Sequence, residues 1–400
     1  MSSTNPPVDV KATEDRLMRF LAIDGVSGQE AAIAAAVADE LKKVGVPASA
    51  IRFDTVNERI SLPTQIGNMI VTLPGTRPGP RLAFATHLDT VLLCAGAKAS
   101  RNGDRIVSDG TTALGGDNRT GCAVLVTLVE TILKHGLPHP PLTLLFMVRE
   151  ESGLQGARQL NPADLGGATM GFNVDSKLAA ELIIGAVGAE SWDVEIKGKA
   201  AHAGVAPEKG ISATLVAALA MTEAHQKGWF GKVVRPEGTG TSNVGVVAGK
   251  DGRAVGDATN VVTDYVFMKG ETRSHDAAFA AAITAGYREA FNNATAQVTD
   301  DLGTTAEIKF NGRPEYPPFR IAEDAPVVRH ATHAAESIGL NPHSVLSNGG
   351  LDANWFAQHG LPTVTIGAGQ NEPHTVNEFV DLVEFANGCR LAVALATLET

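Results

Sequence analysis

The sequence predicts an α/β protein with a mostly parallel mixed sheet flanked by helices, and a smaller α+β domain inserted into it. Short apolar runs at 69–73, 82–85, 142–148, 170–174 and 361–366 alternate with stretches of helical periodicity. Continuous apolar runs are typical of strands buried on both faces, and their alternation with helices favours a largely parallel sheet. The pattern changes after Gly185, where the insertion is expected.

The main domain is expected to begin with two helices. Apolar side chains are spaced as in helices over residues 12–45, and the turn sequence at 24–30 interrupts them. A further helix is predicted from Thr120 to His135, where apolar residues recur on one face, and Gly136 should end it.

Residues 187–318 predict the inserted domain. Strands are expected at 191–197, near 242–248 and 261–268, and at 305–310, with helices at about 210–227 and 275–293. This βαββαβ order is that of a ferredoxin-like unit. The stiff, proline-rich segment 313–318 is expected to lead the chain back to the main domain. We therefore expect the main domain to comprise 1–186 and 319–400.

Composition limits the kind of protein. A chain of 400 residues with 44% hydrophobic content exceeds what one core usually holds, which favours two domains. A formal net charge of −11 without a Lys/Arg run argues against nucleic acid or membrane partners and favours a peptide or small-molecule substrate. Because the start lacks an export signal and no apolar stretch approaches a membrane span, we expect a cytoplasmic protein. Cys94, Cys122 and Cys389 are expected to be small buried residues.

Potential metal ligands follow several of the apolar runs. In an open α/β sheet, ligands bind outside the carboxyl ends of the strands. His87 and Asp89 follow the run 82–85 and share one face, so the carboxylate can hold the imidazole N–H. The other candidates are Glu150 and Glu151 after 142–148, Asp175 after 170–174, His374 after 361–366, and Asp117 at the start of the helix at 120–135.

These residues together favour a metal centre, although each has an ordinary interpretation alone. Asp117 could cap a helix, and Glu150 with Glu151 could be a solvated pair. Five converging acids would repel one another, and divalent cations would remove the repulsion. Two histidines and several carboxylates without cysteine suit zinc, cobalt or manganese in a catalytic site.

Seven motifs resemble the M20 dinuclear zinc peptidases, and most of all their peptidase T (tripeptide aminopeptidase) branch. They are HLDT at 87–90, GGDNRTG at 115–121, REESGLQGA at 149–157, NVDS at 173–176, KAAHAG at 199–204, GGLDAN at 349–354 and EPHTVNE at 372–378. The resemblance covers nearly the whole chain in order. It implies a zinc-peptidase-like catalytic domain and an inserted lid and dimerisation domain.

The resemblance also implies two metal ions, most simply zinc. His87 and Asp175 would hold one ion, Glu151 and His374 would hold the other, and Asp117 would bridge them. Many members have Asp where this chain has Asn118, which leaves the ligand set unchanged.

Further roles follow from the same resemblance. Asp89 would orient His87, and Glu150 would be the general base, taking a proton from the metal-bridging water and delivering it to the leaving amine. His202 would reach the partner's active site in a homodimer and stabilise the oxyanion. Asn260 and Arg273 would bind the carboxylate or carbonyl of the substrate.

The leading hypothesis is a cytoplasmic, homodimeric metallopeptidase that removes the N-terminal residue of short peptides. Carboxypeptidase and deacylase members often have Glu where this chain has Asp175. The Asp at this position therefore favours the aminopeptidase branch. The alternative is a carboxypeptidase or N-acyl-amino-acid amidohydrolase of the same superfamily. A non-catalytic metal-binding protein of the same fold is disfavoured, because all five ligands and the base are present. Asp352 could bind substrate or stabilise its glycine turn, and we expect it to stabilise the turn. His330 and His333 are expected to be solvated.

Overall fold

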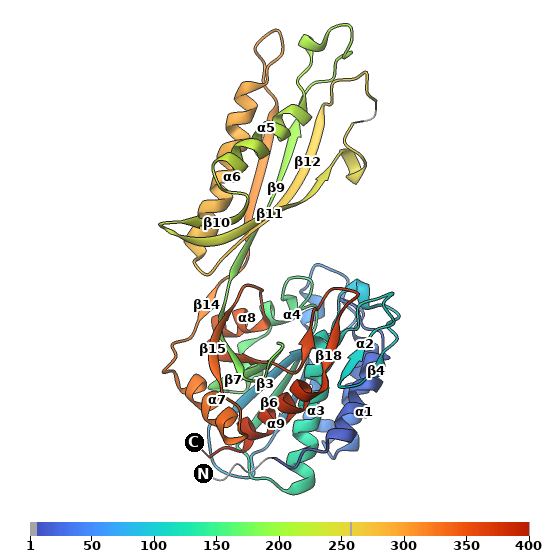
Figure 1. Cartoon of the computed structure of the whole chain (residues 1–400), viewed down its shortest axis with the longest axis vertical. Coiled ribbons are helices and arrows are strands. Elements are labelled where there is room, and N and C mark those ends of the chain that lie inside the picture. The colour runs from blue at the N-terminus through green and yellow to red at the C-terminus, as the bar shows by residue number, and fades with distance from the viewer. Residues whose placement is uncertain (1–5, 257, 400) are drawn as a thin grey trace. The chain divides into compact units, whose positions relative to one another are not determined.

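The computed structural model describes residues 6–256 and 258–399, and Figure 1 labels many of its helices and strands. The chain forms two compact units. The first contains the chain up to Ala186, Arg320–Ser347 and the chain from Leu351 onward; the second contains Val187–Phe319 and Asn348–Gly350. Each unit has its own hydrophobic core.

The first unit is built on a mostly parallel mixed sheet, so the predicted fold class is confirmed. In spatial order the strands are β1 (Ile51–Phe53), β2 (Met69–Leu73), β6 (Leu142–Met147), β3 (Leu82–His87), β7 (Met170–Val174), β16 (Thr363–Ile366), β8 (Glu181–Ala186) and β14 (Phe319–Arg320), and β15 (His343–Ser347) also pairs with β8. β3 runs parallel to both β6 and β7. β16 continues the parallel arrangement on β7, whereas β1 and β2 are antiparallel.

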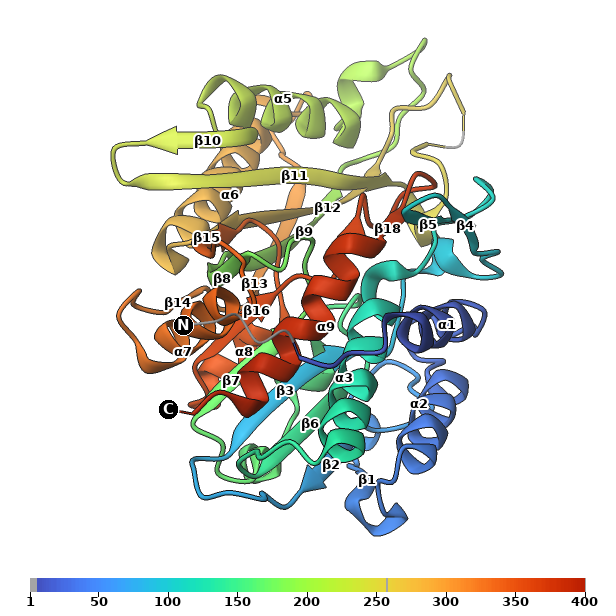
Figure 2. The ribbon, with the colours of Figure 1, turned by 60° about the horizontal axis from the view of Figure 1, so that its bottom comes forward.

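Helices cover both faces of this sheet. One face carries α1 (Val10–Leu21), α2 (Ala31–Lys43), α3 (Gly116–His135), α7 (Pro326–Ser337) and α9 (Leu382–Thr397), and the other carries α4 (Gln155–Arg158) and α8 (Asp352–Gln358). Figure 2 shows α3 and α9 side by side across the strands. Successive strand residues enter different cores: Phe84 and Leu144 face the first group, and Ala85 and Leu145 face the second. Among the described residues, no helix combines the length and the apolar composition that crossing a membrane requires.

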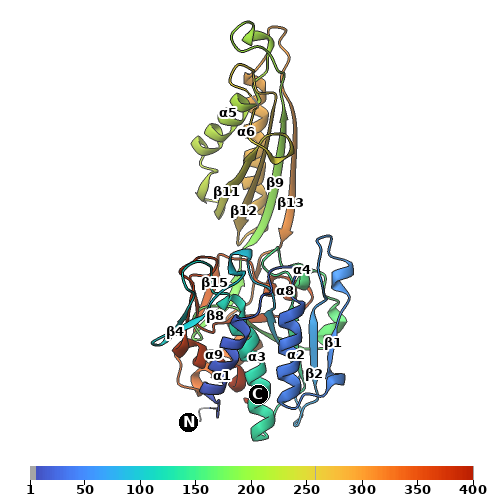
Figure 3. The same cartoon turned by 90° about the vertical axis from the view of Figure 1, so that its right-hand side faces the viewer.

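The second unit has an antiparallel sheet with both of its helices on one face (Figure 3). The strands follow the order β10 (Gly231–Arg235), β11 (Gly238–Ala248), β12 (Tyr265–Ser274), β9 (Gly188–Lys197) and β13 (Glu307–Tyr316), and the helices are α5 (Ala213–Gln226) and α6 (Ala277–Gln297). The sequence did not indicate β10. This edge strand buries only Val233, so it has no alternating pattern to detect.

Trp192 on β9 is the largest side chain of the second core. Its ring packs against Tyr287, Phe291 and Phe310 at centroid distances of 4.8, 6.0 and 5.4 Å. Gly270 lies opposite Trp192 on β12, and a Cβ at this position would be 2.2 Å from the indole ring. Glycine is therefore required here, because the bulky ring occupies the space of a side chain.

A small second sheet in the first unit carries one of the site loops. It contains β17 (Gln370–Asn371), β18 (Phe379–Asp381), β5 (Arg105–Val107) and β4 (Ser100–Asn102), in that order. The loop between β17 and β18 contains His374.

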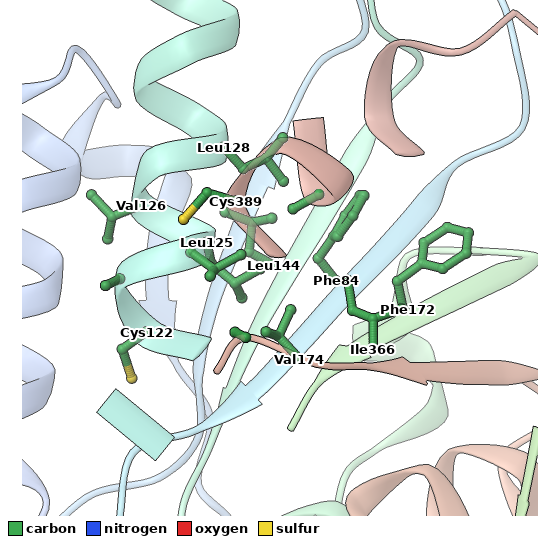
Figure 4. Close-up of a cluster of buried hydrophobic side chains, with 14 of the residues drawn as sticks. Phe84, Cys122, Leu125, Val126, Leu128, Leu144, Phe172, Val174, Ile366 and Cys389 are labelled. Atoms are coloured by element: carbon green, nitrogen blue, oxygen red, sulfur yellow. The ribbon is translucent and has the colours of Figure 1, made fainter. Parts of the chain in front are cut away.

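α3 crosses the main sheet and lies at the centre of the larger core. Leu125 and Leu128 of this helix lie over Leu144 and Phe84 of the strands (Figure 4). Gly136 ends the helix in a left-handed conformation, with φ of 59°, as predicted. The three cysteines are buried and free, which also agrees with the prediction.

His330 is buried, so the expectation that it is solvated is wrong. It lies on the inner face of α7 with Val327, Ala331 and Ala334, and that apolar face determines its burial. Its Nε2 lies 2.8 Å from the Leu395 carbonyl oxygen of α9, and its ring packs on Phe172. Burial lowers the pKa of His330. His333 is exposed, as expected.

His330 should therefore make the stability of the protein depend on pH. A histidine whose folded-state pKa is lowered contributes no penalty above its unfolded-state pKa of about 6.5, and costs stability as the pH falls below that value. We expect His330→Gln to show a shallower loss of unfolding free energy between about pH 8 and pH 5 than the wild type. Urea unfolding across this range measures the effect, and His333→Gln, on the exposed face of the same helix, is the control. Parallel pH profiles for wild type and His330→Gln would contradict the prediction.

Candidate metal centre

The parallel strands bring four candidate residues to one edge of the main sheet. Because β3, β6 and β7 run in the same direction, their carboxyl ends lie together. His87 is the last residue of β3, Glu150 and Glu151 follow β6, and Asp175 directly follows β7. The apolar strands thus position these side chains before any polar contact forms.

Two loops add Asp117 and His374 to the same place. Asp117 lies in the first turn of α3, after Gly115 with φ of 81°, and its own backbone is not helical. The peptide bond between Asp117 and Asn118 is cis. His374 has φ of 64°, and its Nε2 lies 3.4 Å from Asp117 Oδ2.

Asp117 lies between the two histidines. Its Oδ1 is 3.0 Å from His87 Nε2, and its Oδ2 is 3.4 Å from His374 Nε2. Beyond them, His87 Nε2 is 3.6 Å from Asp175 Oδ1, and His374 Nε2 is 2.8 Å from Glu151 Oε1. The side chains thus form two groups, each with one imidazole, that share the Asp117 carboxylate.

The donor set fits divalent cations. Ligand atoms of His87, Asp117 and Glu151 all lie within 4.8 Å of one another. Two ligands of a tetrahedral zinc ion lie about 3.4 Å apart, because each is about 2.0–2.1 Å from the metal. The four nitrogen–oxygen distances of the two groups, from 2.8 to 3.6 Å, are close to that separation. Nitrogen and oxygen donors without thiolate are typical of zinc, cobalt and manganese sites.

Both histidines have raised pKa values because carboxylates surround them. Burial alone would lower the pKa of His87, but its contacts with Asp117 and Asp175 raise it well above the usual value. Contacts with Asp117 and Glu151 raise the pKa of His374 to about 10. Since imidazole binds metals in its neutral form, a cation bound here would replace these protons.

The acids also influence one another. Burial and the charge of Asp117 raise the pKa of Glu151 to about 7, and the same two causes raise the pKa of Asp175. Burial raises the pKa of Glu150 well above its usual value. Within the described part of the chain, the Glu150 carboxylate has no hydrogen bond or ion pair. Glu150 is therefore a buried acid that is free to exchange a proton.

Asp89 fixes the backbone of the two glutamates as well as the ring of His87. The main-chain oxygen of Asp89 lies 3.0 Å from His87 Nδ1, closer than its carboxylate, at 3.4 Å. The buried carboxylate accepts the N–H groups of Glu150 at 2.9 Å and Glu151 at 3.2 Å. It also accepts the Ser27 hydroxyl at 2.5 Å. From the sequence, Asp89 is predicted to orient only the imidazole of His87, and its hydrogen bonds to the two glutamate N–H groups are not predicted.

His202, Asn260 and Arg273 belong to the second unit. The loops of His202 and Asn260 meet where Ala203 N donates to the Asn260 carbonyl oxygen at 2.9 Å, and both side chains are exposed. Arg273 Nε and one terminal nitrogen each lie 3.1 Å from a carboxylate oxygen of Glu271. Asp257, three residues before Asn260, lies outside the described residues.

Asp352 is a buried acid beside the centre, and the expectation that its carboxylate stabilises the glycine turn is wrong. The side chain of Asn354 holds that turn instead, accepting the Leu351 N–H at 2.9 Å. Asp352 is 1% exposed, and neither of its carboxylate oxygens has a hydrogen-bond partner among the described residues. Burial raises its pKa well above the usual value, and the charge of Asp175 adds to the shift.

Comparison with known proteins shows which proteins the chain is similar to. The model of peptidase family M20/M25/M40 matches residues 83–398. The chain is 33% identical over 330 residues to the uncharacterized protein YqjE of Bacillus subtilis, covering 82% of this chain and 84% of that protein. The crystal structure of aminopeptidase PepT from Bacillus cereus is similar with a TM-score of 0.82 at 33% identity, over 98% of both chains. That of a tripeptidase from Staphylococcus aureus has a TM-score of 0.86 at 27% identity, also over 98% of both.

The buried, unpaired carboxylate of Asp352 should destabilise the metal-free protein. An acid with a raised folded-state pKa costs stability above its unfolded-state pKa of about 3.9, and this cost disappears at lower pH. We expect Asp352→Asn to raise the unfolding free energy of metal-free protein by about 1–3 kcal/mol at about pH 8, with a smaller gain as the pH falls towards about 4. Denaturant unfolding measures this gain, with Asp39→Asn on the exposed face of α2 as control. A variant no more stable than wild type at the higher pH would refute it.

Proposed function

The chain belongs to peptidase family M20/M25/M40, and from this premise we propose that it removes the N-terminal residue of short peptides with two divalent metal ions. That it is a peptide-bond hydrolase follows from the family and from its similarity to aminopeptidase PepT and a tripeptidase. One observation carries the two-metal part of the proposal. The two carboxylate oxygens of Asp117 face different histidines, His87 and His374.

In this proposal each ion has its own ligands. His87 and Asp175 hold one ion, Glu151 and His374 hold the other, and Asp117 binds both. Zinc is the proposed metal, with cobalt or manganese as substitutes of the same ligand preference. When bound, the ions lower the pKa of a water molecule and polarise the scissile carbonyl group.

Glu150 is the proposed general base. Its buried carboxylate has no hydrogen bond or ion pair within the described residues, so no other group competes for a proton that it accepts. A carboxylate oxygen of Glu150 takes a proton from the attacking water and gives it to the nitrogen of the leaving amine. Asp89 keeps the backbone of Glu150 and Glu151 fixed, so one glutamate can bind metal while its neighbour moves the proton.

The second unit, residues 187–318, is proposed to be an inserted lid and dimerisation domain in a cytoplasmic homodimer, in which His202 would act at the active site of the partner. His202 is the proposed donor to the oxyanion. Its Nδ1 accepts the Gly204 N–H at 3.2 Å, which leaves the proton of the neutral ring on Nε2. Arg273 and Asn260 are the proposed ligands of the substrate carboxylate or carbonyl, and Glu271 orients the Arg273 guanidinium.

Substitution of the base should separate metal binding from turnover. We expect Glu150→Ala to keep its metal, because Glu150 is not a ligand, and to lose activity by about 10²–10⁴-fold, the usual contribution of a general base. Metal content by elemental analysis and peptide hydrolysis by amine release give the two readings. Removal of metal from the wild type with a chelator should abolish hydrolysis, and readdition should restore it. An active Glu150→Ala enzyme would overturn the assignment of the base.

The end of the peptide at which the enzyme cuts distinguishes the proposed aminopeptidase activity from a carboxypeptidase or amidohydrolase activity. We expect metal-loaded enzyme to release the N-terminal residue from free tripeptides and to leave N-acetylated tripeptides of the same sequence uncut. Mass spectrometry of the products identifies the bond that is cleaved. A preference for the blocked peptides, or release of the C-terminal residue, would instead indicate an amidohydrolase or a carboxypeptidase of the same family.

A further inference from the structure

A buried glutamate outside the ligand set binds the main chain around Asp117. Glu378 is 2% exposed, and its Oε2 accepts the N–H groups of Leu114 at 2.7 Å and Gly115 at 2.9 Å. Its Oε1 accepts the N–H of Asp117 at 3.0 Å. These N–H groups precede or begin α3, where no earlier helical carbonyl is available to them. A carboxylate is well suited to this position, because the start of a helix favours negative charge.

The sequence around Asp117 makes room for this carboxylate. A Cβ on Gly116 would lie 2.7 Å from Val380 Cγ2 and 3.2 Å from Glu378 Oε1. A side chain there would push Glu378 away from the N–H groups it binds. The glycine before Asp117 and the glutamate at 378 are therefore parts of one arrangement, although they are far apart in the sequence.

Glu378 also belongs to the loop that carries His374. Within this loop, Glu378 N donates to the Thr375 carbonyl oxygen at 3.2 Å, and the Thr375 hydroxyl donates to the Glu372 carbonyl oxygen at 2.9 Å. The Glu378 side chain thus ties the His374 loop to the loop of Asp117. The side chains of Asp117 and His374 meet in the centre, where Asp117 Oδ2 lies 3.4 Å from His374 Nε2.

We propose that Glu378 is a positioning residue that sets Asp117 and His374 in their metal-binding geometry before any metal arrives. The inference rests on the proposed metal-dependent function. Outer partners of this kind typically contribute about 10–100-fold to metal affinity, because they reduce the reorganisation that binding requires. Glutamine has the same shape as glutamate, but it offers one neutral acceptor and turns an NH₂ group towards N–H donors.

Metal binding by Glu378→Gln tests the proposal without reference to activity. We expect its dissociation constant for Zn²⁺, measured by competition with a chromophoric chelator, to rise by about 10–100-fold. The absorption spectrum of the Co²⁺-loaded variant should differ from that of wild type, since the ligand geometry changes. Glu372→Gln is the matched control, because Glu372 lies in the same loop, is exposed, and has no side-chain hydrogen bond or ion pair in the described structure.

The possible results separate this inference from the proposed function. A folded Glu378→Gln protein with wild-type affinity and an unchanged Co²⁺ spectrum would overturn the inference alone, whereas a wild type that binds no divalent metal would overturn the proposed function. If Glu378→Gln does not fold, Glu378→Ser, which leaves space for water at the three N–H groups, serves for the same comparison. Failure of both variants to fold would assign Glu378 to the fold and overturn the positioning role.

Discussion

Three parallel strands that end together bring more negative charge to one sheet edge than two histidines can balance, and this excess constrains the rest of the first unit. The charge of Asp117 helps to raise the pKa of both Glu151 and Asp175. The same carboxylates raise the pKa values of His87 and His374. Such a cluster is tolerated in a folded protein when cations or hydrogen-bond donors compensate it.

The chain supplies part of that compensation from its own backbone. Three buried carboxylates bind N–H groups of the loops that carry the site: Asp89 those of Glu150 and Glu151, Glu378 those around Asp117, and Glu30 those of Gly28 and Arg149. The acids are thereby divided into two kinds. Acids of the first kind accept main-chain N–H groups and hold the loops in place. Acids of the second kind, which are the proposed metal ligands and Glu150, face one another across the centre. These hydrogen bonds help to hold the loops in the positions that bring the acids of the second kind close together.

Sequence patterns predicted what depends on local periodicity, and missed what depends on distant partners. The runs that became β3, β6 and β7 are apolar throughout, so the strands and the polar residues after them could be located from the sequence. The role of Glu378 has no such signal, because Asp117, whose N–H it accepts, is 261 residues away. His330 follows the same rule: helical spacing alone did not show that α9 would cover it. Asp352 was recognised within its glycine motif, but only the fold shows that Asn354 performs the task assigned to it.

The way in which the second unit is joined to the chain has a consequence for how this architecture can diversify. The unit starts on β9 and returns on β13, and these strands pair with each other, with Ala189 opposite Tyr316. The two ends of the inserted segment Val187–Phe319 are therefore neighbours, and this segment leaves and re-enters the first unit on two adjacent strands. Closing such a short gap costs little conformational entropy whatever the length of the insert. A change in the length of the inserted segment therefore need not alter the register of the strands that carry the proposed metal ligands.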